Sequence, residues 1–345
     1  MTRSVEDTVR SLALVVLAAA TVAGQAPRID VRFDTAEADA VLAIVKLEQS
    51  GATPAAADWL TLTSTAGYRR LKAREQSLGL IFDDDDFRKF VESDDLAKRA
   101  DDQRRTVETW AHSDVNAAAA RALAYLPDEA TIRATVYAVI KPKKNSFVFD
   151  AATNAAIFLY VDPEKTTAQV ENTMAHELHH IGAASLDAKY EASLASLSPE
   201  ARSVALWTGA FAEGLAMLAA AGGPDVHPHA ASPAADRERW DRDVANFDAD
   251  LRKVEQFFLD VLDRRVTGDA IQREAMTLYG VQGPWYTVGW KMATIVERAF
   301  GRGAVIQAVA DPRTLLVNYN RAVRAGKLDL PLWSDRILAA LSGRP

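Results

Sequence analysis

Five consecutive residues, His176-Glu177-Leu178-His179-His180, have the side chains and the spacing that metal-dependent hydrolysis requires. On a helix, His176 and His180 lie one turn apart and direct two imidazoles at one point. Glu177 lies about 100° around the helix axis, close enough to hold a water on the same metal. A tetrahedral Zn²⁺ with one open position needs a third protein ligand in addition to the two histidines.

The residues around this motif have the pattern of a helix that is buried on two sides. Between residues 166 and 184, apolar residues recur on one face, at Val170, Met174, Leu178 and Ile181. The opposite face carries Asn172, His176, His180 and Ala183. A buried pair of imidazoles needs a polar partner, and a metal ion would be one. The alternatives are a polar helix face and core histidines with ordinary hydrogen bonds.

A candidate for the third ligand is Glu213. If residues 206–220 form a helix, one face combines this carboxylate with small and apolar residues, namely Leu206, Gly209, Ala216 and Ala220. Burying an unpaired carboxylate there is costly, and a metal would compensate its charge. Alternatively, Glu213 pairs with Arg202 or reaches the surface. His227 and His229 are further candidate ligands, although a loop rich in Pro and Ala is more often plain surface.

The order of these motifs resembles known families. The HExxH motif is followed, 33 residues after His180, by Glu213-Gly214-Leu215-Ala216, which resembles the gluzincins, zinc peptidases whose third ligand is a Glu on a second helix. The chain is more closely similar to an uncharacterised bacterial group of predicted zinc-dependent peptidases. That likeness spans residues 132–319 and includes two later motifs, Tyr286-Thr287-Val288-Gly289-Trp290-Lys291-Met292-Ala293 and Phe300-Gly301-Arg302.

The chain departs from the thermolysin pattern at one position. Met217, not Asp, stands four residues after Glu213. The usual acceptor for the first His must therefore come from elsewhere, and Asp187 and Asn172 are the candidates.

Composition narrows the class of protein. The 345 residues are 49% hydrophobic and 25% charged, which is enough for a full core in one large or two modest domains. The net charge of −7 and the lack of a basic stripe interleaved with aromatics argue against binding to nucleic acid. The chain has no Cys, so its fold does not rely on disulfides.

The amino terminus has the shape of a secretory signal peptide. Arg3 and Arg10 precede an apolar run at residues 12–22, and small residues follow. We expect residues 1–26 to be this signal, with cleavage near Gly24, and the mature product to be periplasmic or extracellular without stable membrane insertion. The run is too short to span a bilayer comfortably. An N-terminally anchored or a cytoplasmic protein is the alternative.

Beyond the signal, the pattern predicts an α+β fold that is mainly helical and zincin-like. Residues 27–130 form a helical region, with the first helix capped by Asp34. Residues 131–222 hold a small sheet and the metal-binding helices, and residues 223–345 form a helical C-terminal lobe with one long helix over residues 240–261. Together, residues 27–345 are expected to form one compact unit.

Three strands are expected just before the HExxH helix. Residues 131–140 alternate with a period of two, and residues 146–149 and 156–161 follow after turn residues. The last strand could be the edge to which an extended peptide adds.

These residues predict a zinc metallopeptidase that acts on peptides or proteins. One Zn²⁺ per chain would be held by His176, His180 and Glu213, and Glu177 would act as general base and proton shuttle. Tyr286 is the expected donor to the oxyanion, with Tyr279 as the alternative. A different class remains open, since a zincin scaffold can lose turnover and serve as a binding module.

Overall fold

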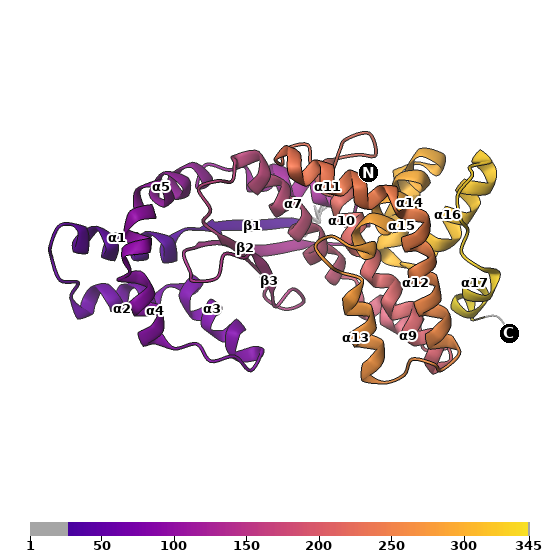
Figure 1. Cartoon of the computed structure of the whole chain (residues 1–345), viewed down its shortest axis with the longest axis horizontal. Coiled ribbons are helices and arrows are strands. Elements are labelled where there is room, and N and C mark those ends of the chain that lie inside the picture. Colours follow the sequence, from indigo (N-terminus) through magenta and orange to yellow (C-terminus); the bar gives the residue numbers. More distant parts are fainter. Residues whose placement is uncertain (1–26, 344–345) are drawn as a thin grey trace, which may run out of the picture.

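The computed structural model describes residues 27–343. The predicted signal peptide, residues 1–26, lies outside this range. The described chain consists of a mixed sheet covered by helices at one end of an elongated molecule, followed by a bundle of helices at the other end (Figure 1). An α+β, mainly helical fold is therefore confirmed.

The sheet has four strands in the order β1-β2-β4-β3. These are β1 (Ile29–Asp34), β2 (Ile132–Val139), β3 (Phe147–Phe149) and β4 (Ala156–Tyr160). β1, β2 and β4 are parallel neighbours, and β3 pairs antiparallel with β4.

Two features of the sheet correct the expectations from sequence. β1 was not predicted, although its sequence, IDVRFD, alternates apolar and charged residues with a period of two. It is only six residues long, and its partner β2 lies about a hundred residues further along the chain. The last strand, β4, is not an edge, since Phe147–Phe149 pairs with it through Phe158, Ile157 and Ala156. The three-residue strand β3 occupies that edge instead.

Six helices surround the sheet in the N-terminal lobe. They are α1 (Ala36–Gln49), α2 (Ala56–Ser64), α3 (Ala66–Ser77), α4 (Asp84–Val91), α5 (Asp94–Trp110) and α6 (Val115–Leu123). The N-cap residue of α1 is Thr35, and the expected cap, Asp34, accepts a hydrogen bond from the Ala36 N–H at 2.8 Å.

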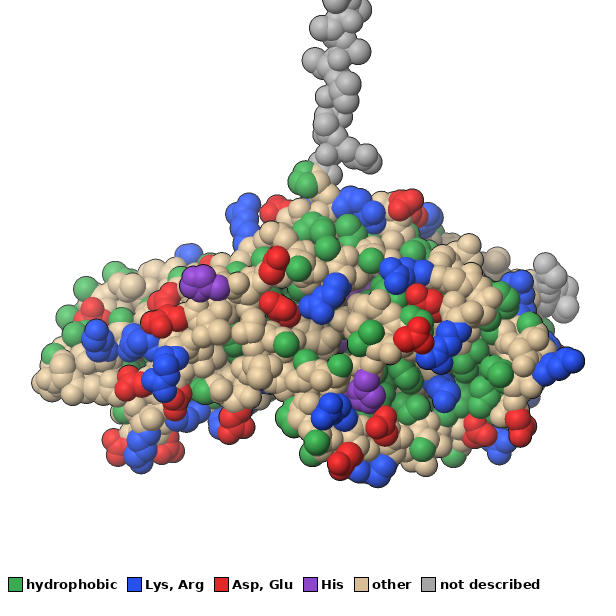
Figure 2. Space-filling view, turned by 90° about the horizontal axis from the view of Figure 1, so that it is seen from above, with side chains coloured by type: hydrophobic (Ala, Val, Ile, Leu, Met, Phe, Trp, Pro, Cys, Tyr) green, Lys and Arg blue, Asp and Glu red, His purple; other side chains and the backbone are tan. Residues whose placement is uncertain are grey.

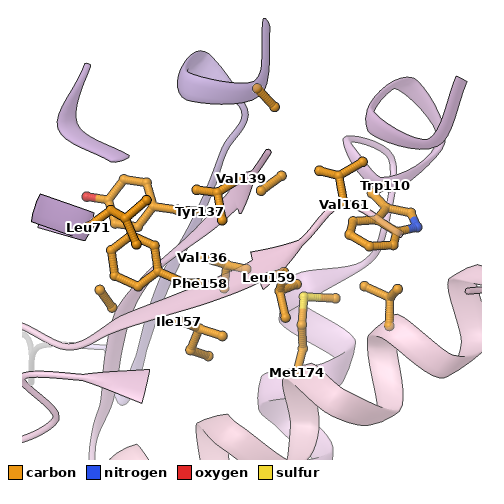
Figure 3. Close-up of a cluster of buried hydrophobic side chains, with 14 of the residues drawn as sticks. Leu71, Trp110, Val136, Tyr137, Val139, Ile157, Phe158, Leu159, Val161 and Met174 are labelled. Atoms are coloured by element: carbon orange, nitrogen blue, oxygen red, sulfur yellow. The ribbon is translucent and has the colours of Figure 1, made fainter. Parts of the chain in front are cut away.

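The core of this lobe anchors the HExxH helix, α7 (Thr167–Ala184), to the sheet. Its predicted apolar stripe is confirmed, since Val170, Met174, Leu178 and Ile181 are all at most 3% exposed. Figure 3 shows Met174 of α7 pointing toward Leu159 of β4, within the apolar layer that also contains Val136 and Trp110. The stripe fixes which face of α7 is left for the site.

The C-terminal lobe is a helical bundle with its own apolar core. Its helices are α8 (Asp187–Ser193), α9 (Pro199–Thr208), α10 (Ala212–Ala221), α11 (Ala234–Ala245), α12 (Phe247–Leu262), α13 (Asp269–Thr277), α14 (Pro284–Phe300), α15 (Arg302–Ala310), α16 (Arg313–Gly326) and α17 (Asp335–Ser342). The long helix expected over residues 240–261 is broken at Asn246, which ends α11 and precedes α12. The division into residues 27–130, 131–222 and 223–345 stays a prediction.

One helical stretch among the described residues, Pro199–Ala221, is long and apolar enough to cross a membrane by length and composition alone. Of its most apolar window, 67% is buried inside the protein, as in the core helix of a globular protein. A short 3₁₀ turn, Gly209–Phe211, lies within this stretch between α9 and α10.

A buried carboxyl group lies where α1 meets the sheet. Glu37 is 1% exposed, and its Oε2 accepts a hydrogen bond from the Ile140 N–H at 2.9 Å. Burial raises the pKa of Glu37 to about 8, although the Ile140 N–H and the charge of Lys141 act in the opposite direction. The group is therefore protonated in the folded protein at pH values where an unfolded Glu is ionised.

This shift predicts a pH dependence of folding stability. Since the folded pKa lies above the unfolded value of 4.5, the contribution of Glu37 is fully present below pH 4.5 and is lost as the pH rises toward about 8. The expected loss is on the order of 1 kcal/mol per pH unit within that window. Glu37→Gln should therefore gain free energy of unfolding relative to wild type between pH 5 and pH 8 in urea titrations. Parallel pH profiles for the two proteins would contradict this, and the exposed Glu238→Gln is the control.

Candidate metal centre and its cleft

The HExxH helix begins with a reciprocal capping box. The Thr166 N–H donates to Gln169 Oε1 at 2.8 Å, and the Gln169 N–H donates to Thr166 Oγ1 at 3.3 Å. These bonds satisfy backbone groups that would otherwise lack partners at the first turn of α7. The helix ends at Ser185, whose hydroxyl donates to the Gly182 carbonyl at 2.6 Å. The predicted range, residues 166–184, matches the observed helix closely.

Helix α10, which carries Glu213, packs very close to α14. A Cβ added at Gly214 would lie 2.1 Å from the backbone nitrogen of Trp290, and one added at Gly289 would lie 2.9 Å from the Phe211 carbonyl oxygen. Neither position can therefore carry a side chain without separating α10 from α14. Both glycines belong to the sequence motifs that carry the family resemblance, which gives those motifs a physical reason.

Two helices place three ligand atoms at one point. Glu213 Oε2 lies 3.2 Å from His176 Nε2 and 3.2 Å from His180 Nε2, and the two Nε2 atoms are 3.1 Å apart. Helices α7 and α10 lie next to each other at the junction of the two lobes (Figure 1). The carboxylate therefore lies against the two imidazoles and not against Arg202.

This arrangement fits a zinc ion. A tetrahedral zinc with bonds of about 2.0–2.1 Å keeps its ligand atoms roughly 3.3 Å apart, close to the three distances observed here. Two imidazole nitrogens and one carboxylate oxygen are also donors that zinc accepts. In the described part of the chain, His176, His180 and Glu213 are the one group of this kind with ligand atoms close enough to share a metal.

The electrostatics of the three groups are strongly coupled. Burial alone would raise the pKa of Glu213, but its contacts with His176 and His180 lower that pKa well below its ordinary value. Burial would lower the pKa of His180, yet Glu213 and the charge of Glu177 raise it. The carboxylate is thus held in its ionised form, which is the form that binds a cation.

Glu177 and Tyr286 line a cleft of about 330 Å³ together with His176. The ring of Tyr286 lies parallel to that of His176, with centroids 6.3 Å apart and planes 10° apart. Burial and the charges of Glu213 and Glu177 raise the pKa of Tyr286 above its ordinary value, so its hydroxyl keeps its proton. Tyr279, the alternative donor, packs against Tyr286 and Trp285 and is not one of the described residues that line the cleft.

A loop that the sequence analysis treated mainly as surface also lines the cleft. His229 faces it, while its Nδ1 lies 3.1 Å from Ser232 Oγ and its ring packs on Trp240. His227 Nε2 lies 3.1 Å from Asp241 Oδ1, and His227 is not part of the group formed by His176, His180 and Glu213. The contact between this loop and α7, a 3.4 Å hydrogen bond from Asn172 Nδ2 to the Pro228 carbonyl, is non-local and leaves no signal in the sequence.

Two further cleft residues come from positions without a sequence signal for function. Met217, one turn after Glu213, lines the cleft where the thermolysin pattern has Asp. Gln282 lines it from a tight loop and has a left-handed backbone, with φ of 80°. A non-glycine residue with this backbone is uncommon and clusters at functional sites.

The expected acceptors for the first His are placed elsewhere. Asn172 donates to the Pro228 carbonyl, and Asp187 is exposed. Among the described residues, His176 Nδ1 is buried without a hydrogen-bond partner. The part of the chain that the structure describes therefore supplies no group that orients His176 through Nδ1, a contact that most metal-binding histidines make.

One face of the molecule carries charges of both signs (Figure 2). Basic and acidic side chains are interspersed over the face drawn in Figure 2. Such a mixture offers no uniform field to steer a polyanion onto that face.

The close approach of α10 to α14 predicts the effect of adding one methyl group. Gly214→Ala should push α10 away from α14, displace Glu213 from the two imidazoles and weaken zinc binding by about tenfold to a hundredfold. Gly209→Ala is the matched control, because a Cβ there meets no atom within 4 Å. Competition titrations against a zinc chelator measure the zinc affinity of both variants. Equal zinc affinity of the two variants would show that Gly214 has no bearing on the site.

Comparison of the chain with known proteins identifies one family. None of the curated proteins and none of the solved structures compared with the chain match it. The model of one family, described as "Putative zinc dependent peptidase (DUF5700)", matches residues 59–327, which is more than half of the chain and includes His176, His180, Glu213 and Tyr286. The chain therefore belongs to this family.

Proposed function

We propose that the protein is a zinc-dependent peptidase of the gluzincin type, with His176, His180 and Glu213 as the ligands of one Zn²⁺. The observation that carries the proposal is the convergence of three ligand atoms, which lie 3.1 to 3.2 Å apart. Glu177, which is not one of these three groups, lines the cleft beside them. The family description supports zinc dependence and peptide or protein substrates.

When bound, zinc polarises the scissile carbonyl and makes a water molecule more acidic. Glu177 takes a proton from that water and delivers it to the nitrogen of the leaving amine. The oxygen of that water bonds to the carbonyl carbon, the C–N bond of the peptide breaks, and the products are a carboxylate and an amine. The position of Glu177 supports this role, since it follows His176 directly and faces the cleft.

Tyr286 donates a hydrogen bond to the oxygen that becomes negatively charged in the transition state. Two observations support this role. Tyr286 lines the cleft and stacks against His176, and its raised pKa keeps the hydroxyl protonated at neutral pH.

The walls of the cleft suit an extended peptide. Gln169 and Thr173 line the cleft from the N-terminal half of α7, and Ser232 and Gln282 line it from other segments. Amide and hydroxyl groups of this kind bind backbone N–H and C=O groups without regard to sequence. A binding module without turnover is the alternative, but metal binding alone would not require Glu177.

We further propose that the protein is exported and that residues 1–26 are removed. The support is the sequence of this segment, with Arg3 and Arg10 before an apolar run. The mature protein recovered outside the cytoplasm should begin close to Gly24 when its N-terminus is sequenced. An intact N-terminus in the cytoplasmic fraction would contradict export.

The role of Glu177 can be separated from metal binding. Glu177→Gln should keep one zinc per chain but lower peptide hydrolysis by about two to four orders of magnitude, because it removes the proton acceptor and no ligand. Metal analysis and a peptide cleavage assay, with and without chelator, measure both effects. Glu171→Gln, on the same helix, is the control. Loss of zinc from Glu177→Gln would mean that Glu177 is a ligand and not a base.

The role of Tyr286 predicts a specific change in kinetics. Tyr286→Phe should lower kcat by about a hundredfold to a thousandfold with little change in KM, since its hydrogen bond forms mainly in the transition state. Tyr279→Phe, which removes a neighbouring hydroxyl, should keep kcat near wild type. If Tyr279→Phe were the slower variant, the oxyanion donor would have been assigned to the wrong tyrosine.

A further inference from the structure

The residues of the proposed site come from two separately packed lobes. His176 and His180 lie on α7, whose apolar stripe belongs to the core of the N-terminal lobe. Glu213 and Tyr286 lie on α10 and α14, and most of the core side chains on these helices belong to the apolar core of the C-terminal lobe. One residue of α10, Ala220, belongs to the N-terminal core instead. The distances within the site therefore depend on how the two lobes are held together.

A turn before β2 packs against the back of α7. A Cβ added at Gly182 would lie 2.2 Å from Leu126 Cδ1, so this turn contacts α7 directly, one turn beyond His179. Burial and the charges of His180 and His176 lower the pKa of His179, while the nearby Tyr125 carbonyl acts in the opposite direction. No hydrogen bond of normal geometry to either ring nitrogen of His179 is found among the described residues.

The side chain of Tyr125 crosses from this turn into the other lobe. It is 1% exposed and belongs to the apolar core of the C-terminal lobe. Its hydroxyl donates to the Glu297 carboxylate on α14, at 3.1 Å to Oε1 and 3.0 Å to Oε2. Burial and the charge of Glu297 raise the pKa of Tyr125, so the hydroxyl remains a donor.

Arg302 completes a closed triangle. Its Nε donates to Glu297 Oε1 at 3.3 Å, and its guanidinium carbon lies 4.3 Å from the centroid of the Tyr125 ring. The Glu297 side chain is 9% exposed, so its charge is compensated by contacts and not by water. Arg302 reaches this position because Gly301, with φ of 81°, turns the chain between α14 and α15.

The same end of α14 also holds the loop that lines the cleft. Arg298 donates to the Pro224 carbonyl at 2.9 Å and to Asp225 Oδ1 at 3.0 Å. A Cβ added at Gly223 would lie 3.9 Å from the Tyr125 hydroxyl. The triangle thus contacts the start of the segment that carries His229.

We propose that Tyr125, Glu297 and Arg302 form a bridge between the lobes, here called the strut. The strut holds the HExxH helix, α7, and the C-terminal lobe at the separation that the zinc site requires. They are positioning residues, because they act through α7 and α14 and do not touch the metal. This inference rests on the proposed zinc site. It also gives a role to the Phe300-Gly301-Arg302 motif, which the chemistry of the cleft leaves unexplained.

A matched pair of variants separates positioning from general stability. Tyr125→Phe removes the hydroxyl that bridges the lobes. Tyr319→Phe removes an equally buried hydroxyl, which donates to the Pro331 carbonyl at 2.8 Å within the C-terminal lobe alone. Both variants should lose a few degrees of melting temperature. Only Tyr125→Phe should weaken zinc binding, by about tenfold or more, in chelator competition.

The relative position of the lobes can be measured without zinc. Because the chain has no Cys, spin labels can be placed at Lys98→Cys in α5 and Arg252→Cys in α12, both exposed positions. The distance distribution between the labels should shift or broaden in Tyr125→Phe and stay as in wild type in Tyr319→Phe. Arg302→Gln changes the more exposed residue of the triangle and should cause the same change in the label distances. It replaces Tyr125→Phe in the experiment if that variant does not fold.

The outcomes distinguish the strut from the proposed function. If wild type binds zinc, and Tyr125→Phe and Arg302→Gln keep both its affinity and its label distances, the strut is wrong and the zinc site stands. If wild type binds no zinc, the proposed function fails, and the label distances alone decide whether the triangle sets the position of the lobes.

Discussion

The contact between the Glu213 carboxylate and the imidazoles of His176 and His180 ties the two lobes of this protein together at their junction. A carboxylate on an apolar helix face is costly to bury, and here its partners come from another helix. The contact is possible because Gly214 and Gly289 let α10 and α14 approach until their backbones almost touch. The same packing that compensates the charge therefore brings together three groups that could hold a metal ion.

Because the groups of the site lie on two lobes, the distances between them depend on contacts outside the site. The apolar stripe of α7 fixes the two histidines to the sheet, and the bundle fixes Glu213 and Tyr286. The cleft is lined by side chains from both lobes, including Asn172 of α7 and Tyr286 of α14. Access for a substrate and the geometry of the proposed metal site thus depend on the same arrangement of lobes. The triangle of Tyr125, Glu297 and Arg302 matters for this reason.

Local patterns made much of the site predictable. The capping box at Thr166 and the apolar stripe of α7 are encoded within one helix, so its range and orientation follow from spacing. Glu213 stands out for a different reason, since a lone carboxylate among small and apolar residues calls for a cation. The placement of that carboxylate against the histidines is a finding of the structure, as are the positions of Glu177 and Tyr286 in the cleft.

Features that depend on distant partners were not predictable. β1 does alternate apolar and charged residues, but it is only six residues long and its partner β2 is distant in the sequence. β3 pairs with β4 although it is three residues long. The break at Asn246 interrupts an apolar stripe that continues on both sides. His229 and Tyr125 owe their positions to tertiary contacts, and neither residue type nor spacing marks them.

The central claim is that one zinc ion is bound by His176, His180 and Glu213. Anomalous diffraction at the zinc absorption edge, from crystals of the zinc-loaded wild-type protein, tests it most directly. The account predicts a single strong anomalous peak within about 2.0–2.2 Å of His176 Nε2, His180 Nε2 and a carboxylate oxygen of Glu213. A peak that lacks Glu213 among its ligands, or that lies at His227 or His229 instead, would contradict the account.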